Sequence, residues 1–306
     1  MTIDMERAFK LPKERRYFNI SVLWIFYYTR VIRLLYRINI RHEAVTLLSL
    51  ASGIAAGIFL LRPGYSNLVL FALFAHLKDV FDASDGSLAR MKGQTNRIAR
   101  FLDSLCDFVA ISWLLAALAI RLYPQFGPAV IPVACAAWIS IFLQCSYFNF
   151  YLVSYTKLYG ATNVRTDERR TGEDERLYGA GWKRILLFVL QRLYAAAYGW
   201  QDRLIATVDR ASYRRAAGEH GADAWDGAGE HRRERWYGDA QLMTLASPLC
   251  FGTHLFIFIV CALLSHPGLL YYIVILPGNV LLVLNIYIRE RRYGRLFRQH
   301  PTSGVN

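Results

Sequence analysis

The apolar residues of this chain gather into long blocks that are separated by strongly charged segments. A membrane-spanning helix needs about 20 mostly apolar residues. Six stretches approach or exceed that length, and they cover 44–61, 67–90, 98–121, 128–156, 242–264 and 269–288. Several contain Gly, Pro or Ser, which helices in a bilayer tolerate. The pattern predicts an all-α integral membrane protein with six transmembrane helices.

The residues before the first apolar stretch predict a helix that lies on the membrane surface. Aromatic and aliphatic side chains are frequent from Phe18 to Tyr28, and they are followed by Arg30, Arg33, Arg37 and Arg41. An apolar face with neighbouring cations suits the interface of a lipid leaflet, and it can also pack on a bundle. We therefore expect residues 1–41 to form a cytoplasmic N-terminal segment with an interfacial helix.

A long polar insert separates the fourth and fifth apolar stretches. Residues 182–208 keep a helical pattern interrupted by charges, which predicts one or two amphipathic helices at the surface. Residues 209–237 are rich in Gly, Ala, Asp and Arg and predict a flexible loop. The expected organisation is an N-terminal segment, transmembrane helices one to four, a cytoplasmic insert, and transmembrane helices five and six with a basic tail, over 1–41, 42–158, 159–238 and 239–306.

Positive charge is concentrated on one side of the predicted membrane. The net charge is +13, and Lys and Arg crowd residues 7–41, 90–100, 157–235 and 289–298. The connections on the other side contain Arg62 and Arg121. The positive-inside rule then places both termini and the insert in the cytoplasm, as expected for a protein of the cytoplasmic membrane. Nucleic-acid binding also favours basic chains, but orientation and anionic membrane lipids explain this charge more simply, so no nucleic-acid partner is expected.

Four aspartates interrupt the second and third apolar stretches: Asp82, Asp85, Asp103 and Asp107. Acids inside a membrane segment are costly and therefore indicate function. At about 100° per residue, each pair lies on one face of its helix. The polar residues 91–96 predict a turn that brings Asp82 level with Asp107, and Asp85 level with Asp103. The four carboxylates are expected to converge near the cytoplasmic surface, within about 20 Å of the turn.

This acidic cluster predicts a metal site. Four carboxylates cannot stay ionised together without cations, and oxygen ligands suit Mg²⁺ or Mn²⁺. Two such ions would balance the charge, and a two-metal site suits phosphoryl transfer. The alternative is a set of structural acids paired with Arg90, Arg97 and Arg100. Two further polar residues precede these aspartates on the same helix. Asp79 is either a further acid of the site or the partner of Lys78. His76 fits a buried core position.

The acidic stretch resembles the signature of the CDP-alcohol phosphatidyltransferase family, D-x2-D-G-x2-A-R-x8-G-x3-D-x3-D. The matching positions are Asp82, Asp85, Gly86, Ala89, Arg90, Asp103 and Asp107. The second Gly of the signature is Ala99 here, which is the smallest alternative side chain. The resemblance implies a six-helix fold, a homodimer, and attack by an acceptor hydroxyl on the β-phosphorus of a CDP-linked alcohol with release of CMP.

The resemblance also assigns roles to individual residues. It implies that the divalent metals are held by Asp82, Asp85, Asp103 and Asp107. Asp107 would in addition be the general base that takes the proton of the acceptor hydroxyl. The CDP site would be lined by Gly86, Ala89, Arg90 and, at the start of the first helix, Thr46.

Outside the signature, the residues leave alternatives open. Taken alone, a threonine at the position of Thr46 is more often just a helix-start hydroxyl. Gly53 and Gly57 on the same helix predict a small-residue packing face. Lys157 and Arg165 could bind an acceptor phosphate, but such cations are also common as anchors for lipid headgroups. The donor is expected to be CDP-diacylglycerol with a polar alcohol acceptor; a soluble CDP-alcohol with a lipid acceptor stays open.

Two other classes of protein compete with the enzyme. A cation or proton transporter also uses membrane carboxylates, but it favours acids at mid-depth on repeat-related helices, whereas these acids flank one turn. An inactive scaffold would not need all four acids. The sequence therefore favours a divalent-metal-dependent membrane transferase of phospholipid biosynthesis.

Overall fold

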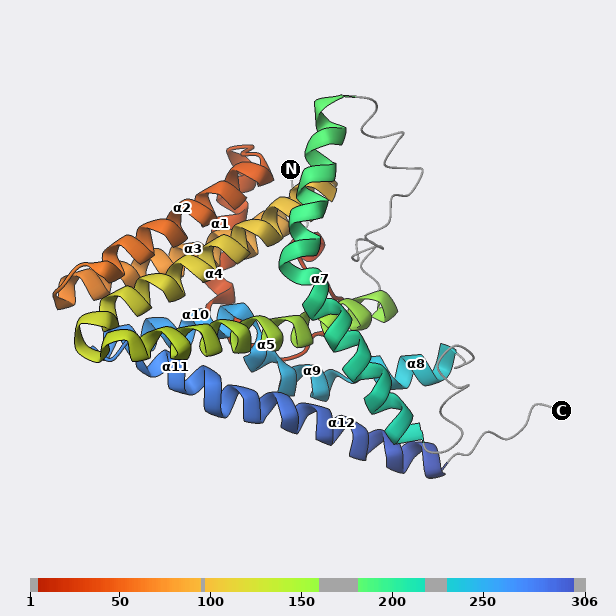
Figure 1. Cartoon of the computed structure of the whole chain (residues 1–306). Helices are drawn as coiled ribbons and strands as arrows, with labels where there is room; N and C mark the ends of the chain where they lie inside the picture. Colours follow the sequence, from red (N-terminus) through yellow and green to blue (C-terminus); the bar gives the residue numbers. More distant parts are fainter. Residues whose placement is uncertain (1–4, 95–96, 160–180, 218–229, 300–306) are drawn as a thin grey trace.

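The computed structural model describes residues 5–94, 97–159, 181–217 and 230–299, and these ranges contain helices and turns but no strand (Figure 1). This confirms the prediction of an all-α protein. Four long helices follow the first four apolar stretches, namely α2 (His42–Leu61), α3 (Tyr65–Lys92), α4 (Arg97–Phe126) and α5 (Val130–Tyr159).

Glycines make the reversals between these long helices. Gly64 between α2 and α3, Gly93 after α3 and the Gly127 that opens the short 3-10 helix η4 (Gly127–Ala129) have positive φ angles of 93°, 63° and 60°. A residue without a Cβ adopts this region at little cost, which is why helices often end there. Figure 1 shows α5 running back from the end of α4, with the two helices diverging away from the turn that joins them.

The C-terminal part adds a second group of helices. They are α9 (Ala240–Ala246), the 3-10 helix η6 (Ser247–Leu249), α10 (Phe251–Leu263), α11 (Leu269–Ile273), the π-helical turn η7 (Val274–Gly278) and α12 (Asn279–Gln299). Pro277 lies inside the π-helical turn. The buried amide of Gln144 on α5 donates to the carbonyl of Val274, at the start of this turn, at 2.9 Å and shares a hydrogen bond of 2.8 Å with His254. Partners of this kind let a helix break inside a membrane without unpaired backbone groups.

One apolar core joins the two groups of helices. Its buried members include Leu60 on α2, Phe71 on α3, Leu114 on α4, Phe142 on α5 and Phe258 on α10. In a bilayer such contacts stabilise by close packing, because lipid already solvates apolar side chains. Within it, α2 packs against both α3 and α4 and so sets the positions of the two helices that carry the acidic residues.

The predicted small-residue face of α2 is confirmed. A Cβ on Gly53 would lie 3.1 Å from the Cβ of Ala110 on α4. A Cβ on Gly57 would overlap the indole ring of Trp113, whose Nε1 donates to the carbonyl of Ile54 at 3.0 Å. The two glycines therefore let α4 approach α2 closely.

The helices are those of an integral membrane protein, although their composition supports fewer spans than predicted. In the described residues, three segments are long and apolar enough to cross a membrane: His42–Leu61, Arg97–Tyr159 and Leu269–Arg295. A fourth is added if Glu234–Leu249 and Phe251–Leu263, bent by 43°, form one span. The 63-residue segment Arg97–Tyr159 contains both α4 and α5, and α3 carries several charges within its length. Six spans therefore stay a prediction.

The N-terminal segment is helical in several short pieces. Three 3-10 helices, η1 (Met5–Ala8), η2 (Lys13–Arg15) and η3 (Ile20–Trp24), precede α1 (Ile25–Arg37). Ile32 and Leu35 of α1 are buried, whereas Phe26 and Leu34 are exposed. The amphipathic helix expected here is thus present in a shorter form, and its place at the membrane interface stays a prediction.

The insert contains one helix longer than expected. Helix α7 (Trp182–Ala217) is continuous over 36 residues, and α8 (Glu230–Tyr237) follows. The prediction of a loop over 209–237 is wrong for 209–217 and 230–237, while 160–180 and 218–229 lie outside the described residues. The physical reason is Asp209, which is 1% exposed and accepts hydrogen bonds from Tyr151 at 2.5 Å, Trp236 at 2.9 Å and Tyr237 at 2.7 Å.

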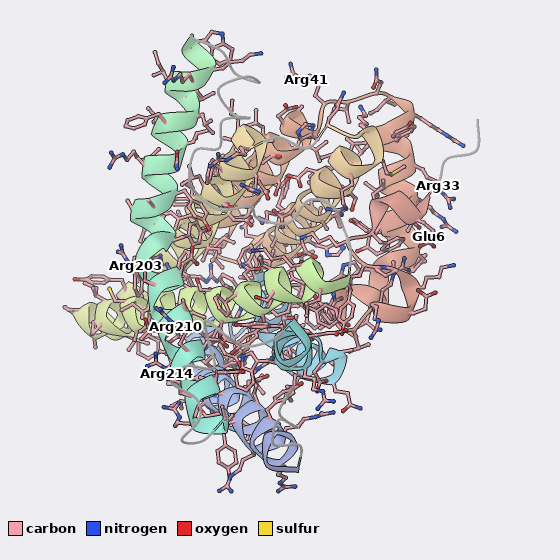
Figure 2. The ribbon with its side chains drawn as sticks, turned by 90° about the vertical axis from the view of Figure 1, so that its right-hand side faces the viewer. Glu6, Arg33, Arg41, Arg203, Arg210 and Arg214 are labelled. Atoms are coloured by element: carbon pink, nitrogen blue, oxygen red, sulfur yellow. The ribbon has the colours of Figure 1, made fainter. Side chains whose placement is uncertain are left out.

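Helix α7 crosses the ends of the long helices at a steep angle and packs against α4, α5 and α12 (Figure 1). Figure 2 looks at the right-hand side of Figure 1, with Arg203, Arg210 and Arg214 along α7 and with Arg33 and Arg41 on the opposite side of the view. At the other end of the bundle, Arg121 donates to the carbonyls of Leu60 and Arg62, both at 2.8 Å. One of the two cations predicted on that side is thus used to cap α2.

Candidate active site

Three of the four signature aspartates meet between α3 and α4. Asp82, Asp103 and Asp107 each offer a carboxylate oxygen, and these oxygens all lie within 4.8 Å of one another. The side chains of Asp82 and Asp107 are 27% and 26% exposed, so the group is open on one side. At about 4 Å, two unit charges repel by about 4 kcal/mol at an effective dielectric constant of about 20. Such a group needs cations to stay ionised.

The fourth aspartate is held by α2. Asp85 is 5% exposed, and its Oδ2 accepts a hydrogen bond of 2.6 Å from the hydroxyl of Thr46. The same hydroxyl lies 3.2 Å from the carbonyl of His42. The structure therefore brings Thr46 to the acidic residues, as a partner of Asp85. Asp85 is outside the group of three convergent oxygens.

A buried lysine completes the cluster. The ammonium of Lys78 on α3 forms an ion pair with Oδ1 of Asp82 at 3.1 Å and with Oδ1 of Asp107 on α4. Lys78 is 1% exposed. If the acids are purely structural, the sequence predicts Arg90, Arg97 and Arg100 as their partners. It predicts Lys78 only as a partner of Asp79. The spacing of four residues between Lys78 and Asp82, which places them on one helix face, is the signal that could have indicated this pair.

The signature residues after Asp85 face the N-terminal segment. The guanidinium of Arg90 donates to the carbonyl of Ala8 through Nε at 3.1 Å and Nη2 at 2.7 Å, and to the hydroxyl of Ser87 at 3.0 Å. A Cβ on Gly86 would lie 3.3 Å from Nη1 of Arg90, so the glycine leaves room for the guanidinium. Ala89 is buried beside it. In this structure, Arg90 is therefore tied to residue 8.

The remaining candidates lie elsewhere. Lys157 is exposed in the last turn of α5, and Arg165 lies outside the described residues.

Ala99 is buried near the start of α4. His76 is half-buried rather than in the core, and it is paired with the hydroxyl of Tyr27. A Cβ on Gly252 would lie 3.1 Å from Oδ1 of Asp79, which places this acid next to the start of α10.

The donor set fits a divalent cation with a preference for oxygen. The convergent carboxylates of Asp82, Asp103 and Asp107 supply hard ligands of the kind that Mg²⁺ and Mn²⁺ take. Their partial exposure gives an ion a route to them. The chemistry of the donor set therefore supports a site for a divalent metal.

Fold and site together define an all-helical membrane protein with a carboxylate cluster between two helices that both pack on α2. The family model for CDP-alcohol phosphatidyltransferase matches residues 20–198, which is more than half of the chain. The chain belongs to this family of transferases. The match begins at η3, contains all four signature aspartates, and ends within α7.

Part of the chain is also similar to a curated protein. The chain is 32% identical over 92 residues to a phosphatidylinositol phosphate synthase of Corynebacterium glutamicum. The aligned part is 28% of this chain and 41% of the relative. The chain thus spans about two fifths of the length of the relative that it matches.

Proposed function

We propose that this protein is a CDP-alcohol phosphatidyltransferase of phospholipid biosynthesis. An acceptor hydroxyl would form a new bond to the β-phosphorus of a CDP-linked alcohol, the bond from that phosphorus to the oxygen of CMP would break, and CMP would leave. The observation that carries the proposal is the meeting of Asp82, Asp103 and Asp107 within the region that matches the family model.

The carboxylates have two tasks in this proposal. Divalent ions, two Mg²⁺ or Mn²⁺, would be held by Asp82, Asp85, Asp103 and Asp107. When bound, such ions neutralise the phosphate charge that grows during transfer. Asp107 is the proposed general base: its side chain is 26% exposed, so an acceptor hydroxyl can reach it and give up its proton. Gly86, Ala89, Arg90 and Thr46 would line the CDP site.

The hydrogen bonds of Arg90 support a proposal for how the donor substrate enters the site. Its guanidinium is bonded to the carbonyl of Ala8, a neutral acceptor, through two nitrogens. Phosphate oxygens form stronger, charge-assisted bonds with arginine than a carbonyl does. A diphosphate that reaches Arg90 can therefore replace Ala8, and the segment around residue 8 would then move away from the site.

For the substrates, we propose CDP-diacylglycerol as the donor and a phosphorylated polyol as the acceptor. The support is the name of the relative from Corynebacterium glutamicum, a phosphatidylinositol phosphate synthase, because inositol phosphate is a phosphorylated polyol. Lys157 and Arg165 are the candidate cations for the acceptor phosphate, since a cation favours a phosphate over a neutral alcohol.

Lys157 offers a test of the acceptor site. Lys157→Ala should raise the KM of the acceptor with little change in the KM of the donor. A mild and equal loss for both substrates leaves Lys157 as a lipid anchor. Lys183→Ala, at an exposed position of α7, is the control.

The orientation and assembly are part of the proposal. The Lys and Arg distribution supports termini, insert and active site on the cytoplasmic side of the cytoplasmic membrane. Family membership supports a homodimer. A cytoplasmic site suits a reaction that uses a water-soluble acceptor and a lipid donor within the bilayer.

The test is metal-dependent release of CMP by the purified protein in detergent. With labelled CDP-diacylglycerol, we expect CMP and a new lipid only when Mg²⁺ or Mn²⁺ and a phosphorylated polyol are both present. A panel of soluble CDP-alcohols with diacylglycerol tests the reverse direction. If no pair yields CMP, and the protein in liposomes instead moves cations or protons across the membrane, a transporter replaces the transferase.

A further inference from the structure

The lysine in the acidic cluster is enclosed by the helices that surround it. The carbonyl of Lys78 accepts a hydrogen bond of 3.1 Å from Ser49 on α2, and its Nζ lies 4.5 Å from the ring centre of Phe251 on α10. A Cβ on Gly53 would lie 3.4 Å from Cγ of Lys78. The side chain is therefore seated in a position built by α2 and α10, unlike a surface lysine that can swing freely.

The ammonium joins the two helices that carry the acids. It contacts Asp82, one turn away on α3, and Asp107 on α4. Both of these acids belong to the group of three convergent carboxylates. Lys78 is 1% exposed, while Asp82 and Asp107 are 27% and 26% exposed, so the ammonium lies on the buried side and the carboxylates are open on the other.

The enclosed position indicates a permanent charge partner. A buried ammonium is tolerated only where acids compensate it, and buried acids likewise need a cation. Before any metal binds, Lys78 is the cation that compensates Asp82 and Asp107. Once a metal is present, the ammonium and the ion repel each other across the shared carboxylates, which weakens metal binding.

We propose that Lys78 is a resident cation of the active site, which holds Asp82 and Asp107 together in the metal-free protein and keeps the affinity for the divalent metal moderate. It is a positioning residue, because it acts through the two carboxylates. The inference rests on the proposed metal site and goes beyond it, since it assigns a role to a residue outside the family signature.

The experiment measures Mn²⁺ binding by electron paramagnetic resonance and thermal unfolding of the full chain in detergent. Lys78→Met keeps a side chain of similar length and removes the charge. We expect Lys78→Met to bind Mn²⁺ at least about tenfold more tightly than the wild type and to lose thermal stability without metal, with recovery when Mn²⁺ is added. The matched control is Lys92→Met on the same helix, where the lysine donates to Asn39 and to the carbonyl of Ile40; its Mn²⁺ affinity should not change.

A second variant separates the effect of the lost charge at Lys78 from the effect of changed packing. The double variant Lys78→Met/Asp82→Asn removes one positive and one negative charge, so the metal-free protein should regain stability close to the wild type. If Lys78→Met folds only with metal, or if it fails to fold while the double variant folds, the charge role is supported. If neither variant folds, or if Lys78→Met binds Mn²⁺ with unchanged or weaker affinity, Lys78 is a packing residue and the inference is overturned. A wild type that binds no Mn²⁺ overturns the proposed metal site itself.

Discussion

The hydroxyl of Thr46 donates a hydrogen bond of 2.6 Å to Oδ2 of Asp85, and it does so between two buried side chains on neighbouring helices. The bond fixes one oxygen of Asp85 and satisfies part of its charge. A buried acceptor that loses its donor costs about 1–3 kcal/mol. This relationship therefore makes Thr46 a support for the acidic cluster, whatever it contacts in the substrate.

Replacing Thr46 tests that support. Thr46→Val removes the donor and should weaken Mn²⁺ binding by roughly 5- to 150-fold, which corresponds to about 1–3 kcal/mol. Thr46→Ser keeps the hydroxyl and should restore most of the affinity. Equal Mn²⁺ affinity in the Val and Ser variants, measured by titration of the purified protein, would show that the bond to Asp85 is irrelevant to the metal.

Removal of one carboxylate charge should stop the reaction. Asp85→Asn is expected to reduce kcat for CMP release by at least about a hundredfold, because a proposed metal ligand loses its charge. The same change in Asp82 or Asp103 should act alike. Asp79→Asn, on the same helix but outside the convergent group, is the control and should retain activity. An Asp85→Asn enzyme with full activity and unchanged Mg²⁺ dependence contradicts the assignment.

The buried carboxyl of Asp209 should give the stability of the insert a defined pH dependence. Burial raises the pKa of Asp209 above its ordinary value of about 3.9, although the hydrogen bonds from Tyr151, Trp236 and Tyr237 act to lower it. The folded protein therefore keeps this proton to a higher pH than the unfolded chain. The resulting stabilisation is fully present below about pH 4 and is lost as the pH rises through the raised pKa of the folded protein. Each pH unit between the folded and unfolded pKa values corresponds to about 1.4 kcal/mol of unfolding free energy.

Asp209→Asn removes this titration. Thermal unfolding of both proteins between about pH 4 and pH 8 should show that the Tm of the wild type, relative to the variant, falls with rising pH. Asp202→Asn on the same helix is the control and should keep the pH dependence of the wild type. If the difference in Tm between the wild type and Asp209→Asn stays constant over this range, the pKa of Asp209 is not raised in the folded protein.

Labelling of single cysteines tests the orientation in the membrane. The background protein lacks the native Cys106, Cys135, Cys145, Cys250 and Cys261. Arg184→Cys, exposed at the start of α7, should react with a membrane-impermeant thiol reagent only after the cells are opened. Tyr65→Cys, at a 55% exposed position after the turn between α2 and α3, should react in intact cells. The reverse result places the acidic site on the outer side.

The acidic cluster could be predicted from the sequence because it depends on local spacing. Asp82 lies close to Asp107 once two helices form a hairpin, and both the helical period and the polar turn can be recognised in the chain. The bond from Thr46 to Asp85 and the position of Lys78 could not be predicted with the same ease. They depend on how α2 and α10 pack on the hairpin, and no local pattern specifies that packing.

The insert shows the opposite case. Residues 209–217 and 230–237 contain many small and charged residues, and composition alone predicts a loop there. The structure makes both segments helical because Asp209, Trp236 and Tyr151 form a buried hydrogen-bonded group that joins α7, α8 and α5. Partners that are 27 and 58 residues away decide the outcome, so tertiary contacts override the local preference.

The segment from Ala8 to Phe18 has partners spread along most of the chain. Ala8 accepts from Arg90, the carbonyl of Arg15 accepts from Tyr155 at 2.9 Å, and the amide of Phe18 donates to Thr244 at 3.2 Å, a separation of 226 residues. Ribosomes add about 5–20 residues per second, so the last of these partners follows Phe18 by about 10 to 45 seconds. This early segment therefore waits for its C-terminal partner while the helices between the two are synthesised. The hydrogen bond between Phe18 and Thr244 can therefore form only after most of the chain has been made.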